Sequence, residues 1–348
     1  MQRPHRRGRP AAHSAWPGFP SPVFRMDISA LIEDVRPELA RVEHEILRHL
    51  STEIPLLNEV GKYILSSGGK RLRPLVAIYA SKVFGGKEEP VILAAAALEY
   101  LHTATLLHDD VVDEADTRRS QKSARLVWGN QASVLVGDYL LATAFRNLTL
   151  LGNAKVLDVI SHTTTLMAKG EILQLVRRYD TATEADYLAI VVHKTACLFA
   201  AAAQIGGCYA GAPPAQQQAL YDYGNELGIA FQVVDDALDY VEERGKIGKP
   251  LGIDLKERKV TLPLSRLLQA GSPSERSRVR EILGQPSISD GNVREVISLM
   301  TKHQVLPYTL AEARRYSVRA KAHLGSLPPG RPREALTQLA DFVVERDL

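Results

Sequence analysis

Two apolar stretches of this chain, both rich in alanine and leucine, end in the same acidic pattern, Asp-Asp-x-x-Asp. The pattern occupies residues 109–113 in the first stretch and residues 235–239 in the second. If both stretches are helical, the first and last aspartates of each pattern lie one turn apart on one face. Carboxylates stacked in this way repel one another, so each helix end is destabilised unless a cation lies between them. Oxygen ligands without histidine or cysteine among them are typical of Mg²⁺, which proteins bind through a few carboxylates, substrate phosphates and water.

Six aspartates are therefore candidate metal ligands. One such pattern alone is a weak signal, because solvated acidic helix faces are common. Two patterns predict a site where Mg²⁺ ions hold a polyphosphate from two sides. The candidate ligands are Asp109, Asp110, Asp113, Asp235, Asp236 and Asp239.

The chain after Asp27 has the periodicity of helices. Ile28, Leu31, Ile32 and Val35 follow the i, i+3, i+4, i+7 pattern of an amphipathic helix. Glycine and proline separate the helical stretches, and we find no series of alternating strands joined by hairpin turns. We predict an all-α, single-domain bundle of about ten or more helices around a central cavity. The helical stretches include 90–110, 131–151, 155–178, 186–208, 216–241 and 260–270.

The composition is that of an ordinary globular protein. With 348 residues, 45% of them hydrophobic, the chain can build a large core. The formal net charge of +3 gives no electrostatic footprint of a nucleic-acid-binding protein. No uninterrupted apolar run reaches the length of a membrane span. Cys197 and Cys208 form no disulfide framework and predict a reducing compartment, the cytoplasm.

The first 25 residues differ from the rest, with five arginines, five prolines and no acidic residue. They lack the apolar core of a secretory signal, and their prolines disfavour the amphipathic helix of an organellar transit peptide. We predict a disordered leader over residues 1–25 and one folded domain over residues 26–348.

Basic residues flank the first acidic pattern. Upstream, the segment GGKRLRP at 68–74 lacks the spacing of a P-loop, but it places Lys70 and Arg73 three residues apart. Together these side chains are suited to clamping a diphosphate. Downstream, Arg118-Arg119 follow the pattern by five residues. Each basic element alone is more typical of a charged turn or a solvated surface, and the combination with two acidic patterns is much stronger.

A further basic segment, residues 242–259, directly follows the second acidic pattern. Its three glycines and one proline exclude a regular helix. A mobile basic loop beside an acidic metal site suits a lid over an anionic substrate, whereas the loop alone is more typical of a solvated linker. Its basic residues are Arg244, Lys246, Lys249, Lys256, Arg258 and Lys259.

In this order and spacing, the motifs resemble those of the all-trans isoprenyl diphosphate synthases, particularly the long-chain bacterial polyprenyl (octaprenyl-type) enzymes. The resemblance covers essentially everything after Met26. It implies a catalytic domain over residues 26–348 with the isoprenoid synthase fold. It rests on GGKRLRP (68–74), LLHDDVVDEADTRR (106–119), GDYLL (137–141), GEILQL (170–175), KTA (194–196), FQVVDDALDY (231–240) and GKPLGIDLKERKVTLP (248–263).

The resemblance implies a Mg²⁺-dependent prenyltransferase that condenses isopentenyl diphosphate head-to-tail onto an allylic diphosphate of the farnesyl type. Metal and cationic side chains stabilise the departing diphosphate, and a water-poor cavity protects the carbocation. The double bond of isopentenyl diphosphate attacks, and loss of a proton to the released diphosphate leaves a product one isoprene unit longer. The resemblance also implies a homodimer, and it leaves room for a peripheral membrane contact during product release.

Site residues follow from the same resemblance, position by position. The six aspartates match the two Mg²⁺-binding motifs, and Arg118 matches the residue that holds the allylic diphosphate. The implied catalytic residues are Asp109, Asp113, Lys194, Asp235 and Asp236. The implied isopentenyl diphosphate site comprises Lys70, Arg73, His102 and Arg119. Further implied ligands of the allylic substrate are Lys194, Thr195, Gln232, Lys249 and Lys259.

Two residues depart from the family pattern, because Ser120 and Arg258 stand where the family often has glycine. Neither position carries the chemistry, but Arg258 is expected to change the flexibility or the charge of the lid.

Side chains just before the first acidic pattern bear on product length. A helix rises about 1.5 Å per residue, so each turn below Asp109 adds roughly one isoprene unit of depth. Ala104 and Thr105 lie where short-chain members often carry a bulky aromatic residue. Small residues here leave the channel open and predict a long product. The resemblance implies an octaprenyl-like product of about C35 to C50, a quinone side-chain precursor. Phe145 is a candidate for a deeper floor, and simple core packing explains it equally well.

Alternatives remain open. A terpene synthase also ionises an allylic diphosphate, but the intact second motif and the GGKRLRP clamp disfavour it. An accessory subunit of a heteromeric synthase would be expected to lose the acidic motifs. A catalytic subunit that needs a partner, or a shorter-chain farnesyl or geranylgeranyl diphosphate synthase, is compatible with the motifs.

Overall fold

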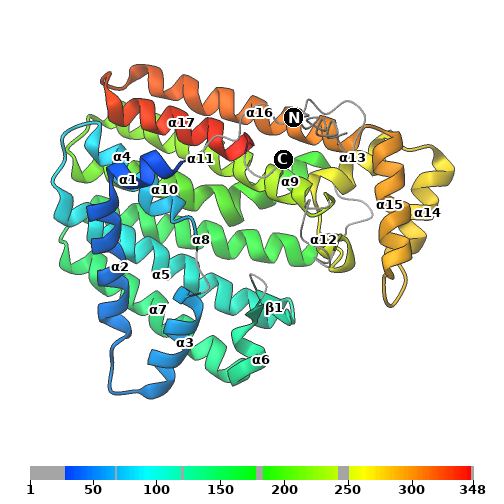
Figure 1. Ribbon diagram of the computed structural model, residues 1–348, viewed down its shortest axis with the longest axis horizontal. Coiled ribbons are helices and arrows are strands. Elements are labelled where there is room, and N and C mark those ends of the chain that lie inside the picture. The colour runs from blue at the N-terminus through cyan, green and yellow to red at the C-terminus, as the bar shows by residue number, and fades with distance from the viewer. Residues whose placement is uncertain (1–27, 67–68, 119–120, 178–182, 242–250, 346–348) are drawn as a thin grey trace, which may run out of the picture.

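The computed structural model describes residues 28–66, 69–118, 121–177, 183–241 and 251–345. Within these ranges the chain is almost entirely helical, which confirms the predicted all-α fold (Figure 1). The predicted leader, residues 1–25, lies outside them, as do Arg119, Ser120 and residues 242–250 of the predicted loop.

The first half of the fold carries the first acidic motif at the end of its longest helix. Its elements are α1 (Ser29–Asp34), α2 (Arg36–Leu50), α3 (Pro55–Ser66), α4 (Leu72–Lys82), α5 (Glu88–Val112), β1 (Thr117–Arg118), β2 (Gln121–Lys122), α6 (Ala124–Trp128), α7 (Asn130–Leu150) and α8 (Ala154–Val176). The two short strands pair antiparallel, with Thr117 opposite Lys122.

The second half carries the second acidic motif at the end of α11. Its elements are α9 (Glu184–Val191), the π-helical turn η1 (Val192–Ala196), α10 (Cys197–Tyr209), α11 (Pro214–Leu238), α12 (Ile253–Lys256), α13 (Leu262–Ala270), α14 (Pro273–Leu283), α15 (Asp290–Lys302), α16 (Val305–His323), the 3-10 turn η2 (Leu324–Ser326) and α17 (Arg331–Glu345).

The helical stretches predicted from periodicity agree with α5, α7, α8, α9 to α10, α11 and α13. Glycines end several of them as expected. After α7, for example, Gly152 adopts a φ of +65°, a left-handed conformation that favours glycine.

The two motif-bearing helices form the centre of the bundle. α5 packs against α7, α4 and α2, and α11 packs against α10 and α16. α10 also contacts α5, α4 and α8, so it connects the two motif-bearing helices. Alanines 94–97 of α5 and 200–203 of α10 are buried, and their small side chains allow these helices to approach closely.

Two described segments, Glu88–Val112 and Glu184–Tyr209, are long and apolar enough to cross a membrane. Neither is an uninterrupted apolar run, because isolated polar residues such as Glu99 and Lys194 interrupt them without lowering their mean hydropathy much. In their most apolar windows, 72% and 61% of the residues are buried inside the fold, as in core helices. Packing within the bundle accounts for their apolar character.

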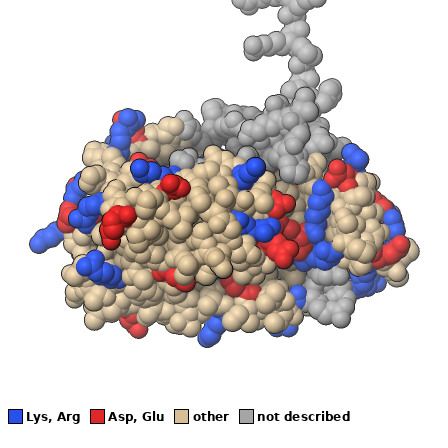
Figure 2. All heavy atoms as spheres, turned by 90° about the horizontal axis from the view of Figure 1, so that it is seen from below, with Lys and Arg blue, Asp and Glu red and all other residues tan. Residues whose placement is uncertain are grey.

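The remaining helices surround this centre. In Figure 1, α16 and α17 run along one side of the bundle, and α14 and α15 stand together at the far end. On the face shown in Figure 2, lysine and arginine side chains are interspersed with aspartate and glutamate and form no continuous basic patch. This distribution agrees with the near-balanced net charge.

Candidate active site

A cavity of about 530 Å³ lies between the acidic ends of α5 and α11. Asp109 and Asp113 line it from α5, and Asp235 lines it from α11. The cavity thus unites two motifs that lie far apart in the sequence. Other predicted site residues in its wall are Lys70, Arg73, His102, Thr105, Arg118, Lys194, Thr195, Gln232 and Lys259.

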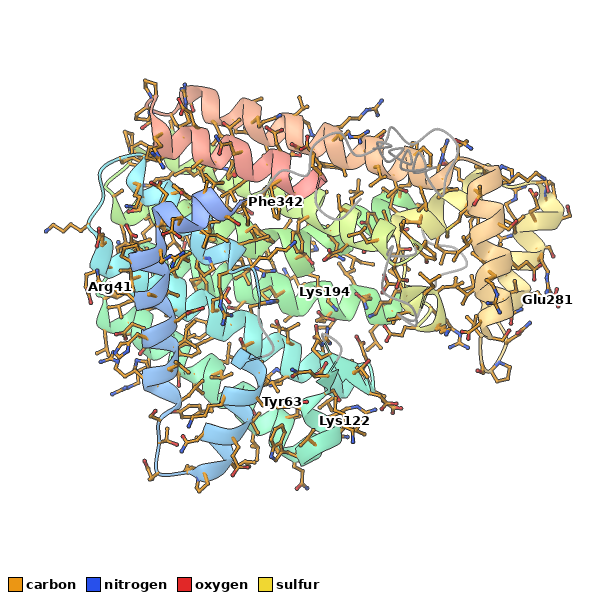
Figure 3. The ribbon with its side chains drawn as sticks, in the orientation of Figure 1. Arg41, Tyr63, Lys122, Lys194, Glu281 and Phe342 are labelled. Atoms are coloured by element: carbon orange, nitrogen blue, oxygen red, sulfur yellow. The ribbon has the colours of Figure 1, made fainter. Side chains whose placement is uncertain are left out.

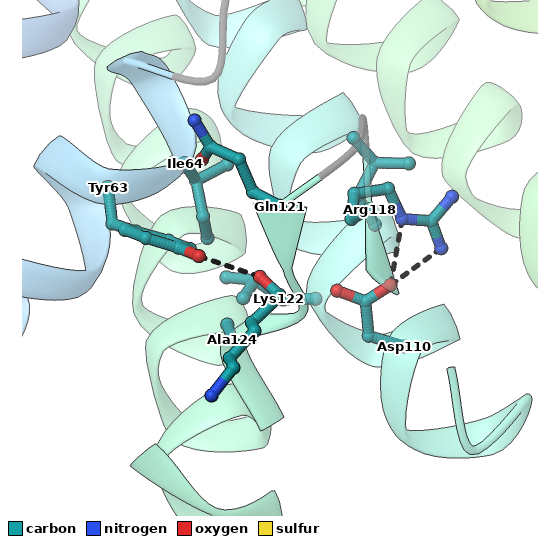
Figure 4. Close-up of a pocket in the computed structure, with 9 residues that line it drawn as sticks. Tyr63, Ile64, Asp110, Arg118, Gln121, Lys122 and Ala124 are labelled. Atoms are coloured by element: carbon teal, nitrogen blue, oxygen red, sulfur yellow. Dashed lines mark hydrogen bonds and ion pairs between the residues drawn. The ribbon is translucent and has the colours of Figure 1, made fainter. Parts of the chain in front are cut away.

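The middle aspartate of the first motif points away from this cavity. Asp110 is 3% exposed, and its Oδ1 accepts hydrogen bonds from Arg118 Nε at 2.8 Å and Nη2 at 2.6 Å. Figure 4 shows this pair in a small neighbouring pocket, where the Tyr63 hydroxyl donates to the backbone carbonyl of Lys122. Because Arg118 lines both spaces, Asp110 holds it at the edge of the main cavity.

In the second motif, too, not every aspartate faces the main cavity. Asp236 is 4% exposed and accepts a hydrogen bond from Gln232 Nε2 at 2.8 Å. Asp239 accepts from the backbone N–H groups of Ile253 at 3.1 Å and Asp254 at 3.0 Å, at the start of α12. Only Asp235 of this motif lines the main cavity, and the other two aspartates hold neighbouring parts of the chain.

The metal prediction can be tested against these donors. In the described part of the chain, no three side chains of His, Cys, Asp or Glu are grouped closely enough to hold a metal by themselves. The acidic motifs nevertheless present only carboxylates to the cavity, and in an adjoining pocket the buried Oδ2 atom of Asp236 makes no hydrogen bond. Such a set fits a hard divalent cation that takes its remaining ligands from phosphate and water.

Buried negative charge makes a cation favourable here. Burial raises the pKa of Asp109, and repulsion from Asp113 adds to the effect, although Lys194 opposes both. Burial raises the pKa of Asp236 to about 7, since its hydrogen bond from Gln232 compensates only in part. Burial likewise raises the pKa of Asp239. The carboxylates are thus under-neutralised by the protein alone.

The π-helical turn η1 positions Lys194, which lies near the middle of the molecule (Figure 3). Its ammonium lies 2.8 Å from the Glu171 carboxylate and 3.6 Å from Asp109 Oδ2. Glycines on the neighbouring helices make room for this wider turn. A Cβ on Gly170 would lie 2.7 Å from the backbone nitrogen of Lys194, and one on Gly228 would lie 2.5 Å from Ala196 Cα. Short π-helical insertions are frequent at functional sites.

A hydrogen-bonded row links this turn to the second motif. The Thr195 hydroxyl donates to Gln232 Oε1 at 3.0 Å, and Gln232 donates onward to Asp236. The row explains why Thr195 and Gln232 share the cavity wall, because each orients the next.

Lys259 contacts the first motif from the segment after α12. Its ammonium lies 3.6 Å from Asp113 Oδ2 and 3.8 Å from Asp254 Oδ1, and it also pairs with Glu257. Burial alone would lower the pKa of Lys259, but these three carboxylates raise it, so the side chain stays charged. Part of the predicted loop is therefore ordered against the site, and it includes the single turn of α12, where no helix was expected.

The structure shows how Arg258 is accommodated at a position where the family often has glycine. Its φ of 57° is left-handed, a conformation in which glycine would be unstrained. The arginine compensates by donating hydrogen bonds to the carbonyl oxygens of Leu283 and Pro286 at 3.0 and 3.3 Å, and to that of Gln285. It anchors this segment to the end of α14.

The upstream clamp forms the basic side of the cavity. Lys70 Nζ lies 5.0 Å from the ring centroid of Phe342 on α17, and the Arg73 guanidinium lies 4.5 Å from that of Phe199. Both contacts have cation–π geometry. With His102, the two side chains form a wall suited to an anion.

The positions predicted to control product length are separated by the fold. Thr105 lines the cavity, and its hydroxyl donates to the backbone carbonyl of His102 at 2.8 Å. Ala104 is 1% exposed and packs in the core, and Phe145 is a half-buried residue packed against that core. Among the described residues, neither of these two lines the 530 Å³ cavity. Apolar lining comes instead from Leu106, Met167, Leu198, Phe199 and Phe231.

Sequence reasoning missed three charged residues of the cavity wall. Glu171 belongs to the GEILQL motif but was given no role, and Arg71 was passed over between Lys70 and Arg73. Glu99 lies one turn before His102, on a helix whose apolar pattern gave no reason to single it out. Arg119 and Lys249 were predicted as ligands and lie outside the described residues.

Comparison with known proteins places this chain in a family. Residues 54–300 match the sequence model of the family described as Polyprenyl synthetase. The chain is 41% identical over 327 residues to the octaprenyl diphosphate synthase of Escherichia coli (strain K12), covering 92% of this chain and 100% of that protein.

Solved structures agree with this result. The crystal structure of a decaprenyl diphosphate synthase from Rhodobacter capsulatus is similar with a TM-score of 0.86 and 40% identity, over 92% of this chain and 100% of that one. A polyprenyl synthase from Caulobacter crescentus CB15, complexed with calcium and isoprenyl diphosphate, gives a TM-score of 0.89 and 37% identity, over 93% and 99% of the two chains. The chain therefore belongs to the polyprenyl synthetase family, as its motifs predicted.

Proposed function

We propose that this protein is a Mg²⁺-dependent prenyltransferase that condenses isopentenyl diphosphate with an allylic diphosphate and repeats the step to make a long all-trans polyprenyl diphosphate. The observation that carries the proposal is the 530 Å³ cavity, in which residues of both acidic motifs face a basic wall. This arrangement suits two anionic substrates, one on each side. The Caulobacter relative, complexed with calcium and isoprenyl diphosphate, supports a divalent cation together with a prenyl diphosphate.

The residues of the cavity fit the two halves of such a reaction. Mg²⁺, when bound to the aspartates, supplies charge neutralisation at the leaving diphosphate. Lys194, Lys259 and Arg118 add fixed positive charge to the same side, which favours breaking the allylic C–O bond with its electron pair moving to the diphosphate. Lys70 and Arg73 hold the diphosphate of the second substrate opposite.

The apolar part of the wall suits the carbocation formed in this step. Leu198, Phe199 and Phe231 exclude water, and the aromatic faces favour positive charge. The double bond of isopentenyl diphosphate then forms the new C–C bond. A proton is lost to the released diphosphate, and a longer allylic diphosphate remains for the next round.

Repetition requires space below the first motif. Thr105 lines the cavity one turn below Asp109 and presents a small side chain there. The relatives that make octaprenyl and decaprenyl diphosphates support a product of about C40 to C50, which continues the depth argument for the helix.

The proposal includes a homodimer in the cytoplasm. Exposed apolar side chains on the neighbouring helices α7 and α8 support an interface with a second copy, among them Leu135, Leu150, Ile172 and Leu175. Cys197 and Cys208 are both free thiols, and burial raises the pKa of each, which suits unreactive cysteines in a reducing compartment.

The test is whether diphosphate release depends on two substrates and a metal. The purified chain is incubated with farnesyl diphosphate, with isopentenyl diphosphate, and with both, in Mg²⁺ or in EDTA. We expect release only with both substrates and only in Mg²⁺. Release from farnesyl diphosphate alone would instead indicate a terpene synthase, and no release without another protein would indicate a subunit of a heteromeric enzyme.

A further inference from the structure

A buried ion pair lies in the basic wall of the cavity, where no function has been assigned to it. Arg71 Nη1 donates to Glu99 Oε2 at 2.9 Å, and the two side chains are only 16% and 6% exposed. Both residues line the 530 Å³ cavity. A carboxylate in this wall is unexpected, because the wall otherwise presents positive charge to an anion.

The pair connects the two segments that carry the anion-binding side chains. Arg71 lies between Lys70 and Arg73 at the start of α4, and Glu99 lies one turn before His102 on α5. The ion pair therefore ties the GGKRLRP segment to the middle of α5. Arg71 Nε is also 3.8 Å from Glu43 Oε1, a more exposed carboxylate on α2.

The backbone conformation at Arg71 needs a stabilising contact of this kind. Its φ of 47° and ψ of 38° are left-handed, and no side chain caps the start of α4. Residues other than glycine adopt this conformation only where their surroundings hold them. The sharp bend at Arg71 determines how Lys70, before it, is directed relative to Arg73, after it.

Electrostatics gives the pair a second role. Glu99 without its partner would be a buried negative charge beside the binding position of a diphosphate, and in a partly desolvated site such charges repel strongly. Arg71 cancels this charge. The net positive charge of Lys70 and Arg73 is then available to the substrate.

We propose that Arg71 is a positioning residue for isopentenyl diphosphate: its ion pair with Glu99 fixes the Lys70–Arg73 clamp and neutralises the carboxylate behind it. This inference rests on the proposed function, in which the clamp binds that substrate. In this proposal Arg71 affects substrate binding through its ion pair with Glu99 and does not contact the diphosphate directly.

A double-mutant cycle separates these two possibilities. Binding of isopentenyl diphosphate is measured by titration calorimetry in EDTA, so that the aspartates hold no metal and the basic wall is the binding site. Arg71→Gln should weaken binding on the order of 30-fold, because Glu99 is left buried and unpaired. Glu99→Gln alone should change the Kd by less than about fivefold. The double variant Arg71→Gln/Glu99→Gln should have a Kd within about fivefold of the wild-type value. Arg71→Lys should rescue part of the loss, because it restores the charge.

Lys82→Gln is the matched control. Lys82 pairs with the buried Glu38, which is 7% exposed, and neither residue lines the cavity. This variant should lose a similar amount of thermal stability and leave Kd unchanged. An equal loss of binding in Lys82→Gln would overturn the inference, because general loosening of the fold would then explain the effect.

Two further results would also overturn it. One is a double variant that binds as weakly as Arg71→Gln, because Arg71 would then contact the diphosphate directly. The other is a Kd changed by less than about threefold in Arg71→Gln. The proposed function is judged separately, by elongation in Mg²⁺. A wild-type protein that binds isopentenyl diphosphate but elongates nothing contradicts the function, while the cycle still decides the role of the pair.

Discussion

Replacing Asp236 with asparagine tests the charge balance of the acidic cluster. Asp236 is 4% exposed, and its Oδ1 accepts a hydrogen bond from Gln232, which an asparagine oxygen can also accept. The substitution therefore keeps the shape and removes one buried negative charge. In EDTA, we expect the variant to be more stable than the wild type, although it should be a poorer enzyme.

The size of the gain follows from the pKa. Burial, with repulsion from Asp235 and Asp239, raises the pKa of Asp236 from 3.8 to about 7 despite the hydrogen bond from Gln232. At 1.36 kcal/mol for each tenfold change, ionising this group in the folded protein costs up to about 4 kcal/mol at pH 8. For a chain of this size that corresponds to a rise in Tm of about 6 °C.

The pH dependence has a definite sign. A carboxyl group whose pKa is higher in the folded than in the unfolded protein destabilises the fold once it ionises. The full penalty applies when the pH is above the pKa of the group in the folded protein. This penalty shrinks as the pH falls through about 7 toward 3.8. The advantage of Asp236→Asn should thus be largest at pH 8 and fall below about half by pH 5.

Thermal unfolding in EDTA, followed by circular dichroism from pH 5 to pH 8, measures this advantage. Adding Mg²⁺ should raise the Tm of the wild type more than that of the variant, because bound metal removes the same penalty. A variant less stable than wild type at pH 8, or a gain independent of pH, would refute the reasoning.

Three further substitutions test other parts of the site. Lys194→Gln leaves Glu171 and Asp109 without their shared cation, so the rate of elongation should fall on the order of 100-fold or more. The far-ultraviolet circular dichroism should be unchanged, and a loss of rate below about tenfold would count against the assigned role. Thr105→Phe places a ring in the cavity wall and should shorten the product seen by chromatography, and an unchanged length distribution would remove this position from the tunnel. Gly170→Ala would place a Cβ 2.7 Å from the backbone nitrogen of Lys194, so it should lower the free energy of unfolding by about 1–3 kcal/mol and slow elongation. Wild-type stability and elongation rate would contradict the close packing of α8 on the π-helical turn.

Much of this site was predictable because its signals are local. The spacing of each acidic motif and the helical periodicity before it indicated where the carboxylates lie, and the structure brings Asp109, Asp113 and Asp235 to one cavity. Asp110 and Asp239 point elsewhere, because their partners, Arg118 and the start of α12, follow the motifs in segments whose position no local pattern reports. Asp236 also lies outside the cavity, although its partner Gln232 is only one turn earlier on α11.

The π-helical turn could not be predicted for the same reason. Residues 184–209 have the pattern of one continuous helix, and the wider turn at Lys194 depends on the close approach of Gly170 and Gly228 from neighbouring helices. Ala104 shows a related limit. Both Ala104 and Thr105 were expected to face the channel, but helix packing turns Ala104 into the core, and of the two only Thr105 lines the cavity.

The size of the product tests the central claim most directly. The purified chain alone is incubated with Mg²⁺, labelled isopentenyl diphosphate and farnesyl diphosphate, and the dephosphorylated products are separated by length. We predict a ladder that ends at about C40 to C50, as a cavity open below the first acidic motif allows. A product that stops at about C15 to C20, or no elongation by the chain alone, would contradict the account.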